Sequence, residues 1–202
     1  MKKNKIWIFK SKSEMIFSII FFILFMIGFI YFGKKDYSVN QISDSDKFVS
    51  EHKEVVKDNV FTYINVADAY NYVRKDDVLL LIGIKNSNWV GYYANILNEV
   101  AKEVGITQIY YYDITEDRQE ANGTYESIVQ YLKNYISYLD DGKMNLYGPT
   151  MVIKKNGIIT MFDDETAIIK GNITAEEYWS NYQTGLKKNT LKIALEDYLR
   201  KE

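Results

Sequence analysis

Residues 79–103 read LLLIGIKNSNWVGYYANILNEVAKE, a stretch in which a strand, a turn and a helix follow one another. The opening apolar run is typical of a strand that is buried on both faces. After a short polar turn around Trp89, apolar residues recur at helical spacing, and Gly105 predicts the end of that helix. The stretch therefore predicts a buried strand that leads directly into a long helix.

The segments on either side of this unit continue the alternation of strands and helices. Residues 60–66 (VFTYINV) are β-like, residues 66–75 (VADAYNYVRK) are helix-like, and residues 107–114 (TQIYYYDI) predict a third strand. This β-α-β-α-β order predicts an α/β domain with a mixed or parallel sheet and helices on both faces.

The second half of the chain predicts a helix, a hairpin and further helices. Residues 127–139 place apolar side chains on one helical face, and residues 150–162 form two β-like runs around Asn156 and Gly157, a strong hairpin signal. Thr174 begins a capping box that opens a helix. A polar break at residues 188–190 predicts a separate last helix.

Residues 15–32 are free of charged side chains, and as a helix they would span about 27 Å. Residues 1–14 carry five Lys and one Glu, so this basic tail is expected to stay in the cytoplasm. We expect an uncleaved transmembrane signal anchor, with the globular domain outside the cytoplasmic membrane. A cleaved signal peptide is the alternative, although no small-residue cleavage site follows the apolar run.

Residues 33–202 hold 20 basic and 26 acidic side chains, a net charge of −6 that argues against binding nucleic acid through its phosphates. Residues 33–59 are polar and predict a stalk, in which His52, the only histidine, is interpreted as solvated. The chain has no Cys, which excludes disulfides, thiol catalysis and thiolate metal sites.

Two stretches carry a resemblance to a known family: the polar turn at residues 87–90, and YGPTMVIKKNG at residues 147–157, which contains the only proline, Pro149. They resemble the thioredoxin-like superfamily, in particular bacterial bacteriocin transport accessory proteins. The resemblance implies a thioredoxin-like fold over residues 60–187, a central mixed sheet flanked by helices, with residues 188–202 as a C-terminal helical extension. It also implies a cis peptide at Pro149, in a loop that faces the turn.

The resemblance implies a site that corresponds to the family's redox site but lacks its two reactive cysteines. Ser87 and Val90 occupy the positions of the family's two cysteines, Asn88 the position of its proline, and Trp89 the position of its aromatic residue. Disulfide exchange needs a thiolate, so we expect no enzymatic activity, no cofactor and no metal. Leu81 stands where thioredoxins bury a carboxylate.

Two residues of the turn have alternative roles. Ser87 is expected to cap the helix, because serine accepts a hydrogen bond from a free N–H group at a helix start. Trp89 is either an exposed contact residue or a partly buried packing residue. The acidic residues 163–165 are interpreted as a solvated turn rather than a cation site.

The sequence therefore suggests a redox-inactive, membrane-anchored domain that binds a protein or peptide partner, as an accessory to bacteriocin or peptide export. The partner is expected in the groove between the turn and the Pro149 loop, where an extended peptide could pair with exposed backbone. The alternatives are a structural subunit of a membrane complex, which uses its anchor and C-terminal helix, and an enzyme of unrecognised type. The expected contact residues are Ser87, Asn88, Trp89, Val90, Gly148, Pro149 and Thr150.

Overall fold

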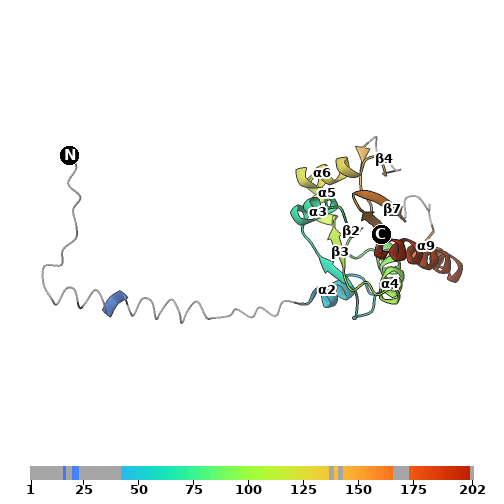
Figure 1. Cartoon of the computed structure of the whole chain (residues 1–202), viewed down its shortest axis with the longest axis horizontal. Coiled ribbons are helices and arrows are strands. Elements are labelled where there is room, and N and C mark those ends of the chain that lie inside the picture. Colours follow the sequence, from blue (N-terminus) through green and yellow to red (C-terminus); the bar gives the residue numbers. More distant parts are fainter. Residues whose placement is uncertain are drawn as a thin grey trace. The chain divides into compact units, whose positions relative to one another are not determined.

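Strand β2 (Val78–Gly83) lies at the centre of a mixed five-stranded sheet, and all six of its residues are buried, as its apolar sequence predicts (Figure 1). Its side chains alternate between the two faces of the sheet: Leu79 and Leu81 enter one core, and Leu80 and Ile82 enter the other. The computed structural model describes residues 16, 20–22, 42–136, 139–140, 143–165 and 173–200.

The strand order is β1-β3-β2-β6-β7. Strands β1 (Phe61–Tyr63) and β3 (Ile109–Asp113) run parallel to β2, whereas β6 (Thr150–Lys155) pairs antiparallel with β2, and β7 (Ile158–Asp164) antiparallel with β6. The predicted mixed sheet is therefore confirmed.

The hairpin between β6 and β7 turns at the predicted position. Asn156 and Gly157 have φ values of +49° and +80°, which is the left-handed pair that a tight hairpin turn requires. The Asp77 carboxylate accepts a hydrogen bond from Asn156 N–H at 3.0 Å, and the Asp76 carbonyl accepts one from Gly157 N–H at 3.0 Å. These bonds fix the turn against the residues that lead into β2.

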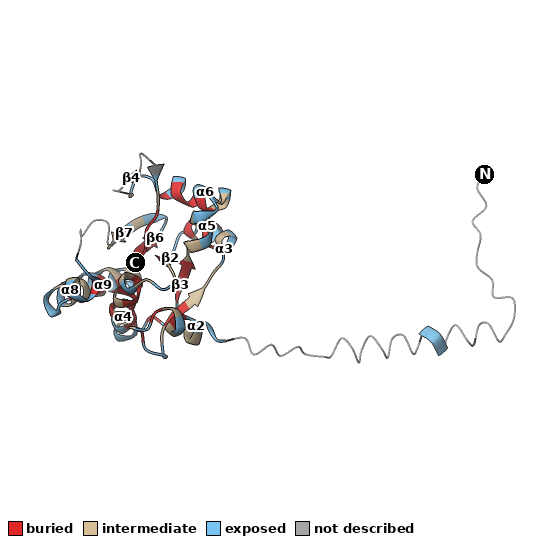
Figure 2. Cartoon of the chain, turned by 180° about the vertical axis from the view of Figure 1, so that it is seen from behind, coloured by how far each residue is buried: buried red, intermediate tan, exposed pale blue. Residues whose placement is uncertain are grey.

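Helices cover both faces of the sheet, and the buried residues lie between them and the strands (Figure 2). One face is covered by α2 (Asp44–Glu51), α4 (Asn88–Glu103), α8 (Ala175–Tyr178) and α9 (Asn181–Leu199). The other is covered by α3 (Val66–Val73) and α6 (Gly123–Leu132). The short elements are α5 (Thr115–Gln119), β4 (Leu139–Asp140) and β5 (Lys143–Met144).

Polar and glycine residues set the helix ends. The side chain of Asn65 accepts a hydrogen bond from Asp68 N–H at 2.9 Å at the start of α3, and Thr174 forms the predicted capping box of α8. Helix α4 ends as predicted, because Gly105 adopts φ +88° and Ile106 N–H then donates to the Ala101 carbonyl at 2.8 Å.

Residues 42–59 differ from the expected stalk, because they pack on the domain. Phe48 of α2 is fully buried, and its ring stacks on Phe61 with 4.3 Å between centroids. Val55 is also buried, and the Asp44 carboxylate accepts a hydrogen bond from Tyr63 N–H at 3.1 Å. Two apolar residues in a polar segment are thus enough to fix this segment beside β1.

Two helices differ from their expected bounds. Helix α9 continues through residues 188–190, because Leu191 and Leu195 are both fully buried on one face beyond the expected break. Helix α6 begins at Gly123, where the Asn122 side chain caps it, and ends at Leu132, so it is displaced from the expected 127–139.

No helix among the described residues is both long and apolar enough to cross a membrane. The expected anchor at 15–32 lies outside the described residues except for positions 16 and 20–22, and the expected tail at 1–14 lies wholly outside them.

Candidate functional site

The turn at residues 87–90 opens helix α4 at the end of strand β2. Ser87 is the N-cap residue, but its side chain makes no capping hydrogen bond, so that part of the expectation is wrong. The Ser87 carbonyl accepts the hydrogen bond of Gly91 N–H at 3.0 Å. Just before the turn, Lys85 N–H donates to Asp113 Oδ1 and to Thr115 Oγ1, both at 3.2 Å, which holds the turn against the end of β3.

The loop at residues 148–150 packs directly against the end of β2. A Cβ atom added to Gly148 would lie 2.7 Å from Gly83 Cα and 2.8 Å from Ile84 N, so only glycine fits this backbone contact. The Gly148-Pro149 peptide is cis, as expected. The structure thus places the loop beside the end of the strand that precedes the turn.

The loop backbone is buried rather than exposed. Gly148, Pro149 and Thr150 are all buried, and Thr150 Oγ1 donates to the Tyr147 carbonyl at 2.7 Å. The Pro149 carbonyl accepts a hydrogen bond from Glu165 N–H at 3.2 Å. The chain itself therefore occupies one backbone group of the loop, the Pro149 carbonyl.

The four residues of the turn differ in access to solvent. Asn88 is exposed, Ser87 and Trp89 are half-buried, and Val90 is fully buried. The Trp89 ring lies 5.2 Å from the ring of Tyr178 in α8, measured between centroids. Of the two roles considered for Trp89, the geometry matches the partly buried packing residue.

A partly buried ionic cluster joins α4, α8, α9 and the end of β7. Lys187 of α9 forms salt bridges with Asp163 at 2.7 Å and Glu165 at 2.8 Å, and the three side chains are 11%, 15% and 12% exposed. Tyr93 of α4 donates its hydroxyl to Asp163 at 2.7 Å, and Tyr178 donates to Glu165 at 3.0 Å. Residues 163–165 are thus not the solvated turn that their sequence suggests.

Burial sets the ionisation state of the cluster's tyrosine. Burial of Tyr93 raises the pKa of its phenol well above the ordinary value, and the nearby Asp163 carboxylate raises it further. Tyr93 therefore stays a neutral hydrogen-bond donor at physiological pH. The salt bridges and phenol hydrogen bonds of the cluster connect α9 and the end of β7 to α4 and α8.

His52 is buried rather than solvated, so the linker interpretation is wrong. It is 1% exposed, its Nε2 lies 3.1 Å from the Tyr111 hydroxyl, and its ring lies 4.6 Å from that of Phe48. Burial lowers the pKa of His52 to about 4, although the Ser87 carbonyl and the Asp113 carboxylate favour the charged form. The imidazole is therefore neutral at pH 7.

The position of His52 bears on catalysis at the turn. The backbone of Ser87 favours the protonated imidazole, and Nδ1 of His52 has no hydrogen-bond partner among the described residues. Among the same residues, no three His, Asp or Glu side chains are placed to hold a metal ion.

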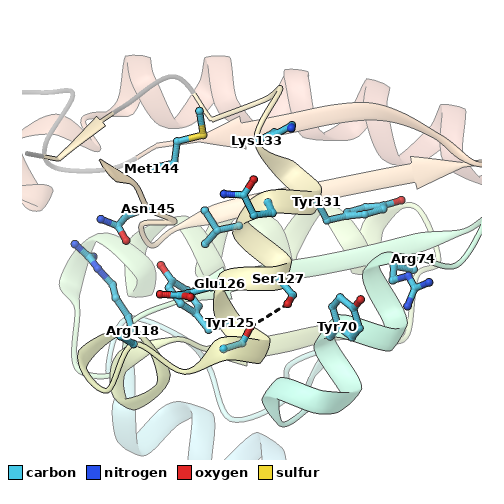
Figure 3. Close-up of a pocket in the computed structure, with 14 residues that line it drawn as sticks. Tyr70, Arg74, Arg118, Tyr125, Glu126, Ser127, Tyr131, Lys133, Met144 and Asn145 are labelled. Atoms are coloured by element: carbon cyan, nitrogen blue, oxygen red, sulfur yellow. Dashed lines mark hydrogen bonds between the residues drawn. The ribbon is translucent and has the colours of Figure 1, made fainter. Parts of the chain in front are cut away.

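A second candidate region lies across α6, on the other face of the sheet (Figure 3). It is a cavity of about 1250 Å³ between α3, the start of α6 and strand β5. Its lining includes Tyr70, Arg74, Arg118, Tyr125, Glu126, Tyr131, Lys133 and Asn145. Sequence reasoning did not find this region, because the residues come from separate segments that share no motif.

Comparison with known proteins does not assign either region. No family model matches the chain, and no curated protein is significantly similar to it. The functional assignment therefore rests on the geometry of the residues described above.

Proposed function

We propose that this chain is a thioredoxin-like domain without redox activity that binds a protein or peptide partner outside the cytoplasmic membrane, in peptide or bacteriocin export. The contact of Gly148 with Gly83 and Ile84 carries the proposal, because it sets the loop against the end of β2, the strand that leads into the turn that opens α4. The strand order, with three parallel strands followed by an antiparallel hairpin, also supports this fold.

The loss of redox activity follows from the side chains at the turn. A disulfide reductase needs a thiolate that attacks a disulfide sulfur, and neither the hydroxyl of Ser87 nor the isopropyl group of Val90 can do this. Val90 is also fully buried, where it packs into the core around α4. In this proposal the position of the second cysteine has become a packing position.

The partner's contact surface differs from the groove that the sequence suggests. Since residues 148–150 are buried, we place the contact on exposed Asn88 and on the exposed part of Trp89. Tyr178 packs against Trp89 and extends this surface onto α8. The partner in this arrangement binds side chains rather than adding a strand.

A second candidate function, a structural subunit of a membrane complex, is favoured by the outer face of α9. Tyr182, Leu186 and Ile193 are 71%, 49% and 60% exposed, and at 3.6 residues per turn they fall within about 40° of one another. Leu191 and Leu195 point the opposite way and are fully buried. An apolar stripe opposite the buried face would suit a contact with another subunit.

Site-specific photocrosslinking separates the two candidates. A benzoylphenylalanine would replace Asn88 at the turn, Tyr182 on the outer face of α9, or Lys53, an exposed control position. Each full-length variant would be irradiated in the cells that naturally produce the chain. The proposed function predicts one discrete crosslinked protein from position 88 that positions 53 and 182 do not give.

Two other results are decisive. A discrete product from position 182 alone favours the structural subunit. The absence of any product specific to position 88 contradicts binding at the turn.

A further inference from the structure

The cavity across α6 has a charge opposite to that of the domain around it. Residues 33–202 carry 20 basic and 26 acidic side chains, a net charge of −6. Among the described residues that line the cavity, Arg74, Arg118 and Lys133 are cationic and Glu126 is the one anionic side chain. The described lining residues thus carry two more positive than negative charges, which favours a negatively charged ligand.

The cations are spread along the cavity rather than gathered at one point. Arg118 and Arg74 flank α6 from opposite sides, and Lys133 lies toward the far end of that helix (Figure 3). The Arg118 guanidinium lies 4.1 Å from the centroid of the Tyr147 ring, and that of Arg74 lies 5.0 Å from the Tyr70 ring. These cation–π contacts orient both guanidinium groups. The spacing favours an elongated ligand with several separated negative charges.

Two tyrosines add neutral hydrogen-bond donors to the lining. Lys154 is 4% exposed and donates from its ammonium group to the Tyr131 hydroxyl oxygen at 2.9 Å. Leu146 N–H likewise donates to the Tyr125 hydroxyl oxygen at 3.2 Å. Because both oxygens accept from the chain, each phenol retains its own O–H proton for donation. Carboxylates are the natural acceptors for such protons.

We propose that this cavity binds an extended acidic peptide segment of the partner, so the inference rests on the proposed function and names its partner chemistry. Separated carboxylates along an extended chain match the separated cations, with the phenols as donors between them.

Fluorescence anisotropy of a labelled oligo-glutamate peptide tests the assignment, with the full-length chain in a non-ionic detergent. The proposal predicts saturable binding that weakens with added salt. Arg74→Gln and Lys133→Gln each remove an exposed cation, so each should raise Kd by about two- to fivefold. Glu126→Gln removes the opposing carboxylate and should lower Kd. Lys53→Gln, a control outside the lining, should leave Kd unchanged.

Because Glu126→Gln should lower Kd and Arg74→Gln should raise it, the test is specific to the cavity. Absence of oligo-glutamate binding, or binding that the three lining substitutions leave unchanged, overturns the proposal. Tripolyphosphate serves as a second probe: if it binds with the predicted variant dependence and oligo-glutamate does not, the peptide assignment is wrong. Partner crosslinking from Asn88 in a chain that does not bind oligo-glutamate would leave the proposed function standing while the cavity inference fails.

Discussion

Lys187 Nζ lies 2.7 Å from Asp163 Oδ2, in a salt bridge whose side chains are 11% and 15% exposed. The same ammonium group bridges to Glu165 at 2.8 Å. One ammonium group therefore pairs with two carboxylates where little water reaches them, and it holds α9 against the end of β7.

Replacing Lys187 with Met should strongly destabilise the domain. The substitution takes the ammonium group away from both carboxylates in a region that little water reaches, and removal of one partner from a buried ion pair costs about 3–5 kcal/mol. The free energy of unfolding, measured by urea denaturation, checks this. Lys188→Met is the matched control, because the exposed Lys188–Glu99 pair should contribute about 1 kcal/mol or less. Equal losses in the two variants would contradict the role of the buried cluster.

Gly148→Ala tests the contact between the loop and the end of β2. The new methyl group would lie 2.7 Å from Gly83 Cα, and because that neighbour is backbone, we expect a loss of about 1–3 kcal/mol in the free energy of unfolding. Gly185→Ala in α9 meets no atom within 4 Å and should stabilise the helix by about 0.5–1 kcal/mol. Thermal and urea unfolding should show that Gly148→Ala lowers the free energy of unfolding and that Gly185→Ala raises it. An unchanged free energy of unfolding in Gly148→Ala would show that the contact is loose.

His52 should make the domain less stable in mild acid. Its pKa is about 4 in the folded chain and 6.5 as an unperturbed group, so the unfolded state binds more protons between these values. Stability should therefore fall as pH falls through this range, by about 2 kcal/mol between about pH 7.5 and about pH 5. His52→Gln removes this contribution, so its unfolding free energy should change less over the same interval. Identical pH dependence of the two proteins would show that His52 titrates normally.

Protease accessibility tests the proposed orientation in the membrane. The five lysines before residue 15 favour a cytoplasmic N-terminus, so protease added to intact spheroplasts should digest the chain beyond Gly33 and spare residues 1–14. Immunoblots against tags at the two ends would distinguish the products. If the globular domain is protected until the membrane is lysed, the orientation is reversed.

The sheet could be predicted from the sequence because its signals are local. The continuous apolar run of β2 marks a strand with both faces covered, and Asn156 and Gly157 supply the turn that joins β6 to β7. Gly105 marks the end of α4 for a similar local reason. These patterns depend on neighbours within a few residues, so no knowledge of the tertiary structure is needed to read them.

The features that sequence reasoning missed depend on contacts between distant segments. His52 was assigned to a stalk by its polar neighbours, although Phe48 and Val55 were the available signal that this segment packs. Lys187 finds its carboxylates in a different element, and its sequence neighbours do not indicate burial. The polar residues 188–190 suggested a break between two helices, but the structure places the break at residues 179–180, and α9 runs through 188–190 because Leu191 and Leu195 beyond them are buried.

A double-cysteine variant tests the central claim, that residues 87–90 form a thioredoxin-like turn at the start of α4. Full-length chain with Ser87→Cys and Val90→Cys would be titrated by the ultraviolet absorbance of its thiolates and then oxidised. The account predicts an intramolecular disulfide and, in the reduced form, at least one thiol with a pKa below the ordinary value of about 8.5, because the helix N-terminus stabilises a thiolate. Two thiols that titrate near about 8.5 and do not form a disulfide with each other would contradict it.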